Sequence, residues 1–205
     1  MKNIDSKSLY EAKKGNRVFV SMHEVTYEHN GRQSPYFMVT RGSNIVPYKE
    51  KKSDAVVVCA TYEENGEKKL LMASEFRVPI GTRELGFPAG LIDEKDYEGG
   101  VNQREAAIKA AIREVKEETG MDLEVTDVSP PNLYSSAGLT DESITYVFGK
   151  VTGTVSKAGL EGGEDIEVML ISQRQAVVLV NESMPELAHS KTAWPFLFSF
   201  SKGNL

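Results

Sequence analysis

Residues 113–121 are Arg113-Glu114-Val115-Lys116-Glu117-Glu118-Thr119-Gly120-Met121, and they end a predicted helix. Residues at i, i+3 and i+4 share one helix face, so the carboxylates of Glu114, Glu117 and Glu118 converge. Like charges at this spacing repel each other, and the C-terminal turn of a helix favours cations over anions. The cluster therefore requires a compensating positive charge.

Two kinds of cation can compensate these carboxylates. Arg113 and Lys116 lie close in sequence, and a run of Glu and Lys is usually a solvated helix face. Mg²⁺, or Mn²⁺ in its place, is the alternative, because both ions prefer carboxylate oxygens and bind substrate phosphates. The single cysteine and three scattered histidines form no zinc-like pattern, so a metal here is expected to have oxygen ligands.

The helix itself is predicted over residues 103–119. Asn102 can cap its first turn while Glu105 reaches back in a capping box. Gly120 can adopt the left-handed conformation that ends a helix. The apolar stripe expected to pack on a sheet consists of Ile108, Ala111, Ile112 and Val115.

Strand-forming segments lie on both sides of this helix. Residues 17–28 and 36–40 flank an Asn-Gly turn and predict an N-terminal antiparallel pair. Residues 55–62 and 69–74 flank a second Asn-Gly turn and predict a central hairpin. Cys59 lies in the first strand of that hairpin, so we expect a buried, inert thiol.

The rest of the chain alternates strands with helices. Strands are predicted over 123–128, 144–151 and 166–171, with a helix over 173–181. The last segment, to Phe200, is predicted as a helix from about Ser190, with a strand as the alternative because of Pro195 and the alternating aromatic residues. This order predicts an α/β fold with a mixed sheet covered by helices. We expect residues 1–50 to form an N-terminal strand region and residues 51–205 to form the main domain.

Composition limits the function. The 205 residues include 24 basic and 30 acidic ones, a formal charge of −6, which argues against a broad nucleic-acid surface. The longest apolar runs are far too short to span a membrane. The N-terminal residues reach no apolar segment of a secretory signal, so a cytoplasmic location is expected.

A longer pattern surrounds the acidic cluster. The spacing is Gly99-x5-Glu105-x7-Arg113-Glu114-Val115-x-Glu117-Glu118-x-Gly120-Met121. It resembles the Nudix box, with every fixed position filled. That family consists mainly of magnesium-dependent hydrolases of nucleoside diphosphates linked to another moiety.

The flanking segments 75–79, 87–93, 136–142 and 164–168 resemble the ADP-ribose pyrophosphatase branch of this family. The resemblance implies an α/β/α sandwich. It also implies a homodimer formed by the N-terminal strands, in which the partner contributes to the substrate site. The implied activity is Mg²⁺-dependent cleavage of ADP-ribose, or of a related nucleoside diphosphate sugar, to a nucleoside monophosphate and a sugar phosphate.

The resemblance assigns metal and phosphate contacts to individual residues. Glu114 and Glu118 match metal-ligand glutamates, and Glu117 matches the third acidic position. The carbonyl of Ala89 matches a backbone oxygen ligand. Arg77 matches an arginine that contacts substrate phosphate, a role that suits the guanidinium fork.

Other matched residues would move protons or support the site. Glu164 matches a proposed general base. A base outside the metal cluster is favoured because a carboxylate that already binds metal is a poor proton acceptor. Glu142 is the competing base. Glu105 and Arg113 match residues that brace the loop and the metal-binding glutamates.

The sequence departs from its relatives next to the box. Gly90 is separated from Glu105 by 14 residues, so an insertion of about nine residues lies within 94–103 and Gly99 matches the box only formally. Gly86 replaces a common glutamate, for which Glu84 is the nearest substitute. Two alternative functions therefore stay open: a Nudix hydrolase of a dinucleoside polyphosphate, coenzyme or oxidised nucleotide, and a non-catalytic ADP-ribose sensor.

Overall fold

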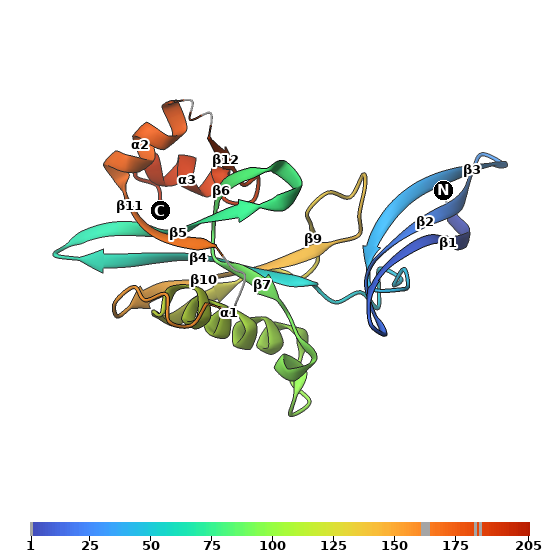
Figure 1. The fold of residues 1–205 in the computed structure, drawn as a ribbon, viewed down its shortest axis with the longest axis horizontal. Coiled ribbons are helices and arrows are strands. Elements are labelled where there is room, and N and C mark those ends of the chain that lie inside the picture. Colours follow the sequence, from blue (N-terminus) through green and yellow to red (C-terminus); the bar gives the residue numbers. More distant parts are fainter. Residues whose placement is uncertain (1, 161–164, 183, 185) are drawn as a thin grey trace. The chain divides into compact units, whose positions relative to one another are not determined.

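The computed structural model describes residues 2–160, 165–182, 184 and 186–205. The chain divides into two compact units (Figure 1). Unit 1 is Met1–Asp54 together with Asn132–Ile144, and unit 2 is Ala55–Pro131 together with Thr145–Leu205. The division expected at residue 50 stays a prediction.

Unit 1 contains an antiparallel sheet in the order β1-β2-β3. Its strands are β1 (Lys2–Lys14), β2 (Arg17–His29) and β3 (Arg32–Arg41). The β2–β3 turn has Asn30 and Gly31 at φ 51° and 73°, the backbone of a tight hairpin. The predicted N-terminal pair is confirmed. Strand β1 was not predicted, because its mixed polar sequence lacks alternation and its pairing with β2 has three register shifts.

The sheet of unit 2 is mixed, as predicted. Its main path runs β12-β6-β5-β4-β10-β8, with β11 paired to β5 and β7 paired to β4. Only the β12–β6 pairing is parallel among the described pairings of this sheet. The strands are β4 (Ala55–Glu64), β5 (Glu67–Arg77), β6 (Thr82–Gly86), β7 (Ala89–Leu91), β8 (Asp122–Val128), β10 (Ser143–Thr152), β11 (Ile166–Ser172) and β12 (Leu187–His189).

Most predicted elements of unit 2 are confirmed. The β4–β5 hairpin turns at Asn65 and Gly66, which have φ of 52° and 80°. The stretch after the hairpin holds η1 (Val78–Ile80), β6 and β7, none of which was predicted. Strand β9 (Leu133–Tyr134), in unit 1, pairs with the first residues of β10.

Helices cover both faces of the unit 2 sheet (Figure 1). Helix α1 (Gln103–Thr119) lies on one face, and α2 (Gln173–Asn181) packs with α3 (Trp194–Ser201) on the other. This layering confirms the predicted α/β sandwich. The C-terminal helix begins at Trp194 rather than near Ser190, because β12 and a turn occupy the preceding residues. Among the described helices, none has the length and apolarity needed to cross a bilayer.

Helix α1 begins and ends as its sequence predicts. The side chain of Asn102 accepts a hydrogen bond from the backbone N of Glu105 at 3.0 Å, and Glu105 Oε2 accepts from the Asn102 N at 2.9 Å. Gly120 ends the helix at φ 73°. Both ends depend on local contacts, which is why the sequence defines them.

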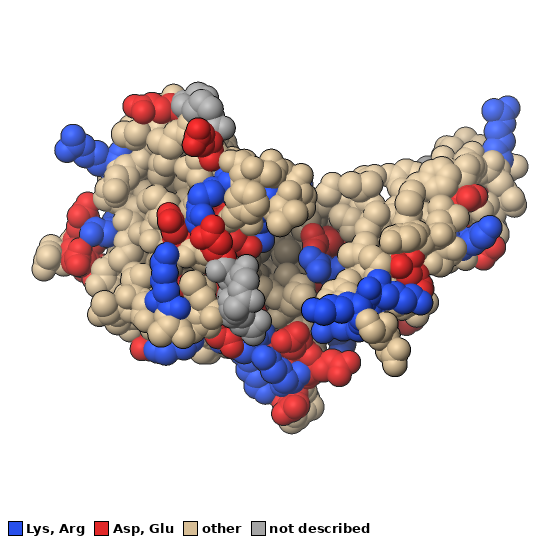
Figure 2. Space-filling model, viewed as in Figure 1, with Lys and Arg blue, Asp and Glu red and all other residues tan. Residues whose placement is uncertain are grey.

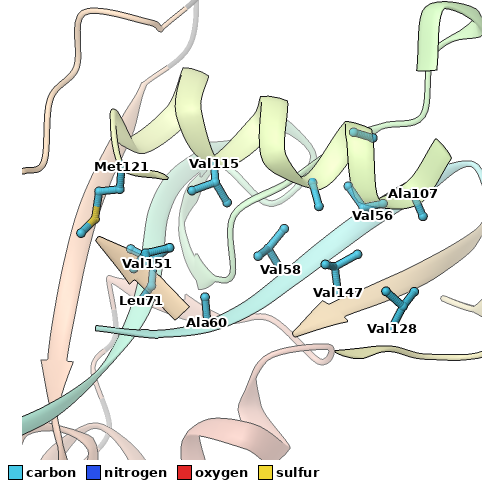
Figure 3. Packing of buried hydrophobic residues seen from close by; sticks show 12 residues of the cluster. Val56, Val58, Ala60, Leu71, Ala107, Val115, Met121, Val128, Val147 and Val151 are labelled. Atoms are coloured by element: carbon cyan, nitrogen blue, oxygen red, sulfur yellow. The ribbon is translucent and has the colours of Figure 1, made fainter. Parts of the chain in front are cut away.

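Small residues bring α1 close to the sheet. Ala107, Ala110, Ala111 and Val115 are fully buried against residues such as Val58 and Val147 (Figure 3). The prediction that Ile112 belongs to this stripe is wrong, because its side chain is 44% exposed. The buried stripe follows the alanines and continues at Glu118, which is 6% exposed.

The first strand of the central hairpin contains the chain's cysteine. Cys59 is buried, as predicted, and burial raises the pKa of its thiol to about 12. Because the thiolate is the reactive form, this side chain is inert at neutral pH.

Candidate active site

The candidate site begins where α1 meets strand β7. The carboxylate of Glu114 lies directly on Gly90, since a Cβ added at Gly90 would overlap it. Pairing of Gly90 with Val56 and of Ala89 with Val57 fixes this strand in the sheet. The carbonyl of Ala89, the predicted backbone oxygen ligand, belongs to the peptide that joins it to Gly90.

The two glycines that could begin the box differ in their surroundings. Gly90 packs against Glu114, whereas a Cβ at Gly99 would meet nothing within 4 Å. Gly99 has φ 86° and lies in an exposed turn of the insertion. Gly90 therefore makes the close approach to α1, and Gly99 fills the sequence pattern only formally, as predicted.

The three glutamates near the C-terminal end of α1 differ in burial. Glu118 is 6% exposed as a residue, while the side chains of Glu114 and Glu117 are 13% and 38% exposed. As these side chains stand, the described part of the chain contains no group of three or more His, Cys, Asp or Glu residues arranged to hold a metal. The reason is that Glu114 and Glu117 turn towards a cation of the protein itself.

That cation is Arg113. Its Nη1 lies 2.6 Å from Glu114 Oε1 and 3.1 Å from Glu117 Oε2. Its Nη2 donates to the Leu91 carbonyl at 3.0 Å and lies 3.1 Å from Asp96 Oδ2. One guanidinium thus joins α1, β7 and the insertion.

The electrostatic balance around Arg113 favours its charged form. Burial alone lowers the pKa of Arg113, but the hydrogen bond to Asp96 and the charge of Glu114 outweigh that effect. The pKa therefore lies above its ordinary value. Lys116, the other candidate cation, instead donates to the Gly120 carbonyl at 3.1 Å and pairs with Asp122 at 2.7 Å.

The donor chemistry here fits a hard divalent ion. Carboxylates buried as deeply as Glu118 are paired or coordinate metals. Glu114, Glu118 and the Ala89 carbonyl supply oxygen donors, which Mg²⁺ prefers. The contact of Glu114 with Gly90 keeps one of these carboxylates against the strand residue that follows Ala89.

Arg77 lies at the end of β5 between two acids. Its Nη1 is 2.8 Å from Glu75 and its Nε is 3.2 Å from Glu84. Glu75 and Glu84 face each other across β5 and β6. Glu84, the nearest substitute for the missing glutamate at Gly86, therefore holds Arg77 in this structure.

The structure describes only one of the two candidate bases, Glu142. Glu164 lies outside the described residues. Glu142 belongs to unit 1, where its Oε1 accepts from Arg41 Nε at 2.7 Å and its backbone N donates to Thr140 at 3.1 Å. Glu105 caps the first turn of α1, and its predicted role in bracing the loop stays a prediction.

Sequence reasoning missed Arg83. Its Nη1 lies 2.8 Å from Asp165 Oδ2, and its Nε and Nη2 donate to the side chain and carbonyl of Ser74 at 3.0 and 2.6 Å. Asp165 is the first described residue after the segment 161–164. The sequence shows an arginine close to Arg77 and an acidic segment far along the chain, but nothing in it indicates that the two form an ion pair.

Charges on the visible surface are mixed. Figure 2 shows acidic and basic side chains interspersed on the face in view, and they adjoin at the lower end of unit 2, where α1 and the insertion lie. The ion pairs around Arg113 belong to this region of the fold.

The fold and site define an α/β sandwich whose central helix presents acidic residues to a glycine-containing strand. The family model described as NUDIX domain matches residues 51–196. The chain belongs to this family, which confirms the resemblance found in its sequence.

Curated relatives carry related names. A candidate nudix hydrolase of Caenorhabditis elegans is 31% identical over 157 residues, covering 74% of this chain and 65% of the relative. The ADP-sugar pyrophosphatase of Mus musculus is 35% identical over 83 residues, covering 40% of this chain and 34% of the relative. The chain thus spans less than two thirds of these relatives.

A solved structure shares the fold. The crystal structure of an ADP compounds hydrolase matches with a TM-score of 0.58 at 17% identity, covering 100% of this chain and 96% of that one. At this identity the match supports the architecture described above.

Proposed function

We propose that this chain is a Mg²⁺-dependent hydrolase that cleaves ADP-ribose, or a related nucleoside diphosphate sugar, to a nucleoside monophosphate and a sugar phosphate. The observation that carries the proposal is the contact of the Glu114 carboxylate with Gly90, the residue that follows Ala89, one helical turn from buried Glu118. The similarity to mouse ADP-sugar pyrophosphatase supports the substrate class.

The proposed site residues have distinct duties. Glu114, Glu118 and the Ala89 carbonyl would hold Mg²⁺, or Mn²⁺ in its place, with Glu117 at the exposed edge. When bound, the ion would neutralise pyrophosphate oxygens and make water more acidic. Arg113 orients Glu114 by a 2.6 Å contact.

Substrate phosphate would be met by Arg77. Its side chain is 44% exposed, and its guanidinium contacts Glu75 and Glu84. A phosphate can accept two parallel N–H bonds from such a fork. We expect binding to draw at least one N–H of Arg77 from its carboxylate partners to the substrate.

The chemical step is the addition of water to one phosphorus of the pyrophosphate. The bridging P–O bond breaks, and one phosphate leaves with the bridging oxygen. The proton of the attacking water passes to a carboxylate that does not hold metal. We assign this duty to Glu164, with Glu142 as the competing base.

Assembly and location are also part of the proposal. Exposed apolar side chains lie along the N-terminal sheet at Ile4, Leu9, Tyr10, Phe19, Val20, Met22, Tyr36 and Phe37. Exposed apolar surface of this kind marks protein contacts, so we propose that these strands form a homodimer. A free, buried cysteine accords with the reducing cytoplasm.

A substrate panel tests the activity. The full chain would be incubated with Mg²⁺ and ADP-ribose, other nucleoside diphosphate sugars, dinucleoside polyphosphates, coenzymes and oxidised nucleotides. Products would be separated by chromatography. Release of nucleoside monophosphate from the sugars is expected. Preferred turnover of another group would reassign the substrate, and tight ADP-ribose binding without turnover would indicate a sensor.

A further inference from the structure

The insertion between Gly90 and Glu105 brings a carboxylate of its own to the candidate site. Its short helix η2 (Glu94–Tyr97) places Asp96 Oδ2 3.1 Å from Arg113 Nη2. Asp96 is 4% exposed, whereas Glu94 beside it is exposed. Acids are rarely buried this deeply unless they are paired, so the contact with Arg113 is the reason for the burial of Asp96.

The insertion holds Asp96 in place by contacts of its own. Asp96 Oδ2 accepts from the backbone N of Asp93 at 2.9 Å, as part of a capping box. Lys109 of α1 donates to the Glu98 carbonyl at 3.0 Å and ties the end of η2 to the helix. The acid is therefore fixed on a supported turn.

Fixing one side of Arg113 fixes the other. A guanidinium is planar, with its donors in a rigid fork. Nη2 is held by Asp96 and the Leu91 carbonyl, with Asp93 Oδ2 farther away at 3.8 Å, so Nη1 is aimed at Glu114. The orientation of Glu114 thus depends on an acid of the insertion.

We propose that Asp96 is a positioning residue that acts through Arg113 to keep the Glu114 carboxylate available to a divalent ion. The inference rests on the proposed function, because Glu114 is a metal ligand only there. Without the charge of Asp96, the guanidinium would interact more strongly with Glu114 and Glu117 and compete with the ion. Partners that orient metal ligands in this way typically contribute about 10- to 100-fold in metal affinity or activity.

The test is a titration of the full chain with Mn²⁺, in which the electron paramagnetic resonance signal of the free ion measures how much Mn²⁺ is bound. Asp96→Asn should bind Mn²⁺ about tenfold more weakly than wild type or worse. Glu94→Gln removes the same charge from the same short helix without touching Arg113, and it should match wild type. Equal affinity of Asp96→Asn and Glu94→Gln would overturn the proposal.

Two further measurements separate positioning from simple support of the fold. Thermal unfolding shows how much of Asp96→Asn is folded, and a purely structural role would lower the unfolding temperature without weakening Mn²⁺ binding by the folded protein. In an Arg113→Lys background, Asp96→Asn should weaken binding much less, because residues in one network are not additive. Full additivity would contradict action through Arg113.

Hydrolysis by wild type distinguishes the two proposals. If wild type binds Mn²⁺ but cleaves no nucleotide, the proposed function fails, while the affinity comparison still decides the duty of Asp96. If wild type hydrolyses nucleoside diphosphate sugars and Asp96→Asn retains full Mn²⁺ affinity, only the positioning proposal fails. Absence of Mn²⁺ binding to wild type would overturn both.

Discussion

The two units each contain a cation surrounded by acids, buried in unit 1 and partly buried in unit 2, and the two cations have different partners. In unit 1 the Lys51 side chain is 6% exposed, with Nζ 2.9 Å from Asp54 and 3.7 Å from Asp141. In unit 2 the Arg113 side chain is 20% exposed and contacts acids of both α1 and the insertion. Lysine is a compact point charge, whereas arginine is a fork that can join several partners.

The partners of these cations explain the difference. Asp54 also accepts from the Ser143 backbone N at 2.9 Å, and the Lys51 carbonyl accepts from Asn132 at 2.8 Å. The Lys51 group therefore ties distant segments of unit 1 together. The Arg113 group includes the carboxylate that sits on Gly90. The difference predicts that the Lys51 ion pairs stabilise the fold, whereas those of Arg113 orient the proposed metal ligand Glu114.

The largest effect expected is on stability, from Lys51→Met. Removing one partner of a buried ion pair leaves the other charges uncompensated and destabilises proteins by about 3–5 kcal/mol. Denaturant unfolding of the full chain should show a loss of about 3 kcal/mol, while Lys49→Met, at an exposed site, should change little. A Lys51→Met variant as stable as Lys49→Met would remove the distinction between the units.

The next largest effect is on activity, from Glu118→Gln. The amide keeps the side-chain shape but is a poorer metal ligand, so kcat should fall by more than about 100-fold, beyond the range for groups that only orient a ligand. Stability should be kept or improved, because a like charge is removed from the helix end. Loss of folding without a specific loss of activity would make Glu118 a structural residue like Lys51.

A smaller effect is expected from Arg113→Lys. Lysine keeps the charge but loses the fork that spans Glu114 and Asp96. Nucleotide-sugar turnover at low Mg²⁺ should fall about tenfold, and part of this loss should be recovered at saturating Mg²⁺. An unchanged Mg²⁺ dependence would show that a positive charge at position 113 is sufficient without the guanidinium fork. Arg113 would then act as a point charge, as Lys51 is expected to do.

The smallest effect is expected from Arg41→Gln. The Arg41 and Glu142 side chains are 44% and 29% exposed, and exposed pairs contribute about 0–1 kcal/mol. Unfolding should therefore shift by no more than about 1 kcal/mol. A shift as large as that of Lys51→Met would make this pair a second structural centre of unit 1.

The sequence predicts what local contacts determine. The bounds of α1 follow from Asn102, Glu105 and Gly120, which act within a few residues of the helix ends. The two Asn-Gly turns locate hairpins for the same reason. These features need no knowledge of the rest of the fold.

Contacts between distant segments were harder to predict. Strand β12 has only three residues and pairs with β6 about a hundred positions earlier, so no local pattern marks it. The sequence predicts that Ile112 lies in the core, because bulky apolar residues mark an apolar stripe more strongly than alanines do. In the structure the alanines of α1 pack against the sheet instead, and Ile112 is exposed. Asp96 lies in an insertion that the family pattern does not describe, and its partner is 17 residues away.

The contact between Gly90 and Glu114 has a consequence for how this sequence can vary. A methyl group at Gly90 would occupy the volume of the Glu114 carboxylate. Gly90→Ala alone is thus sterically forbidden without movement of the acid, whereas a shorter acid at position 114 would vacate part of that volume. Residues in contact depart from additivity, so the cost of an alanine at position 90 depends on the side chain at position 114: with Glu114 the carboxylate must move, and with a shorter acid it need not.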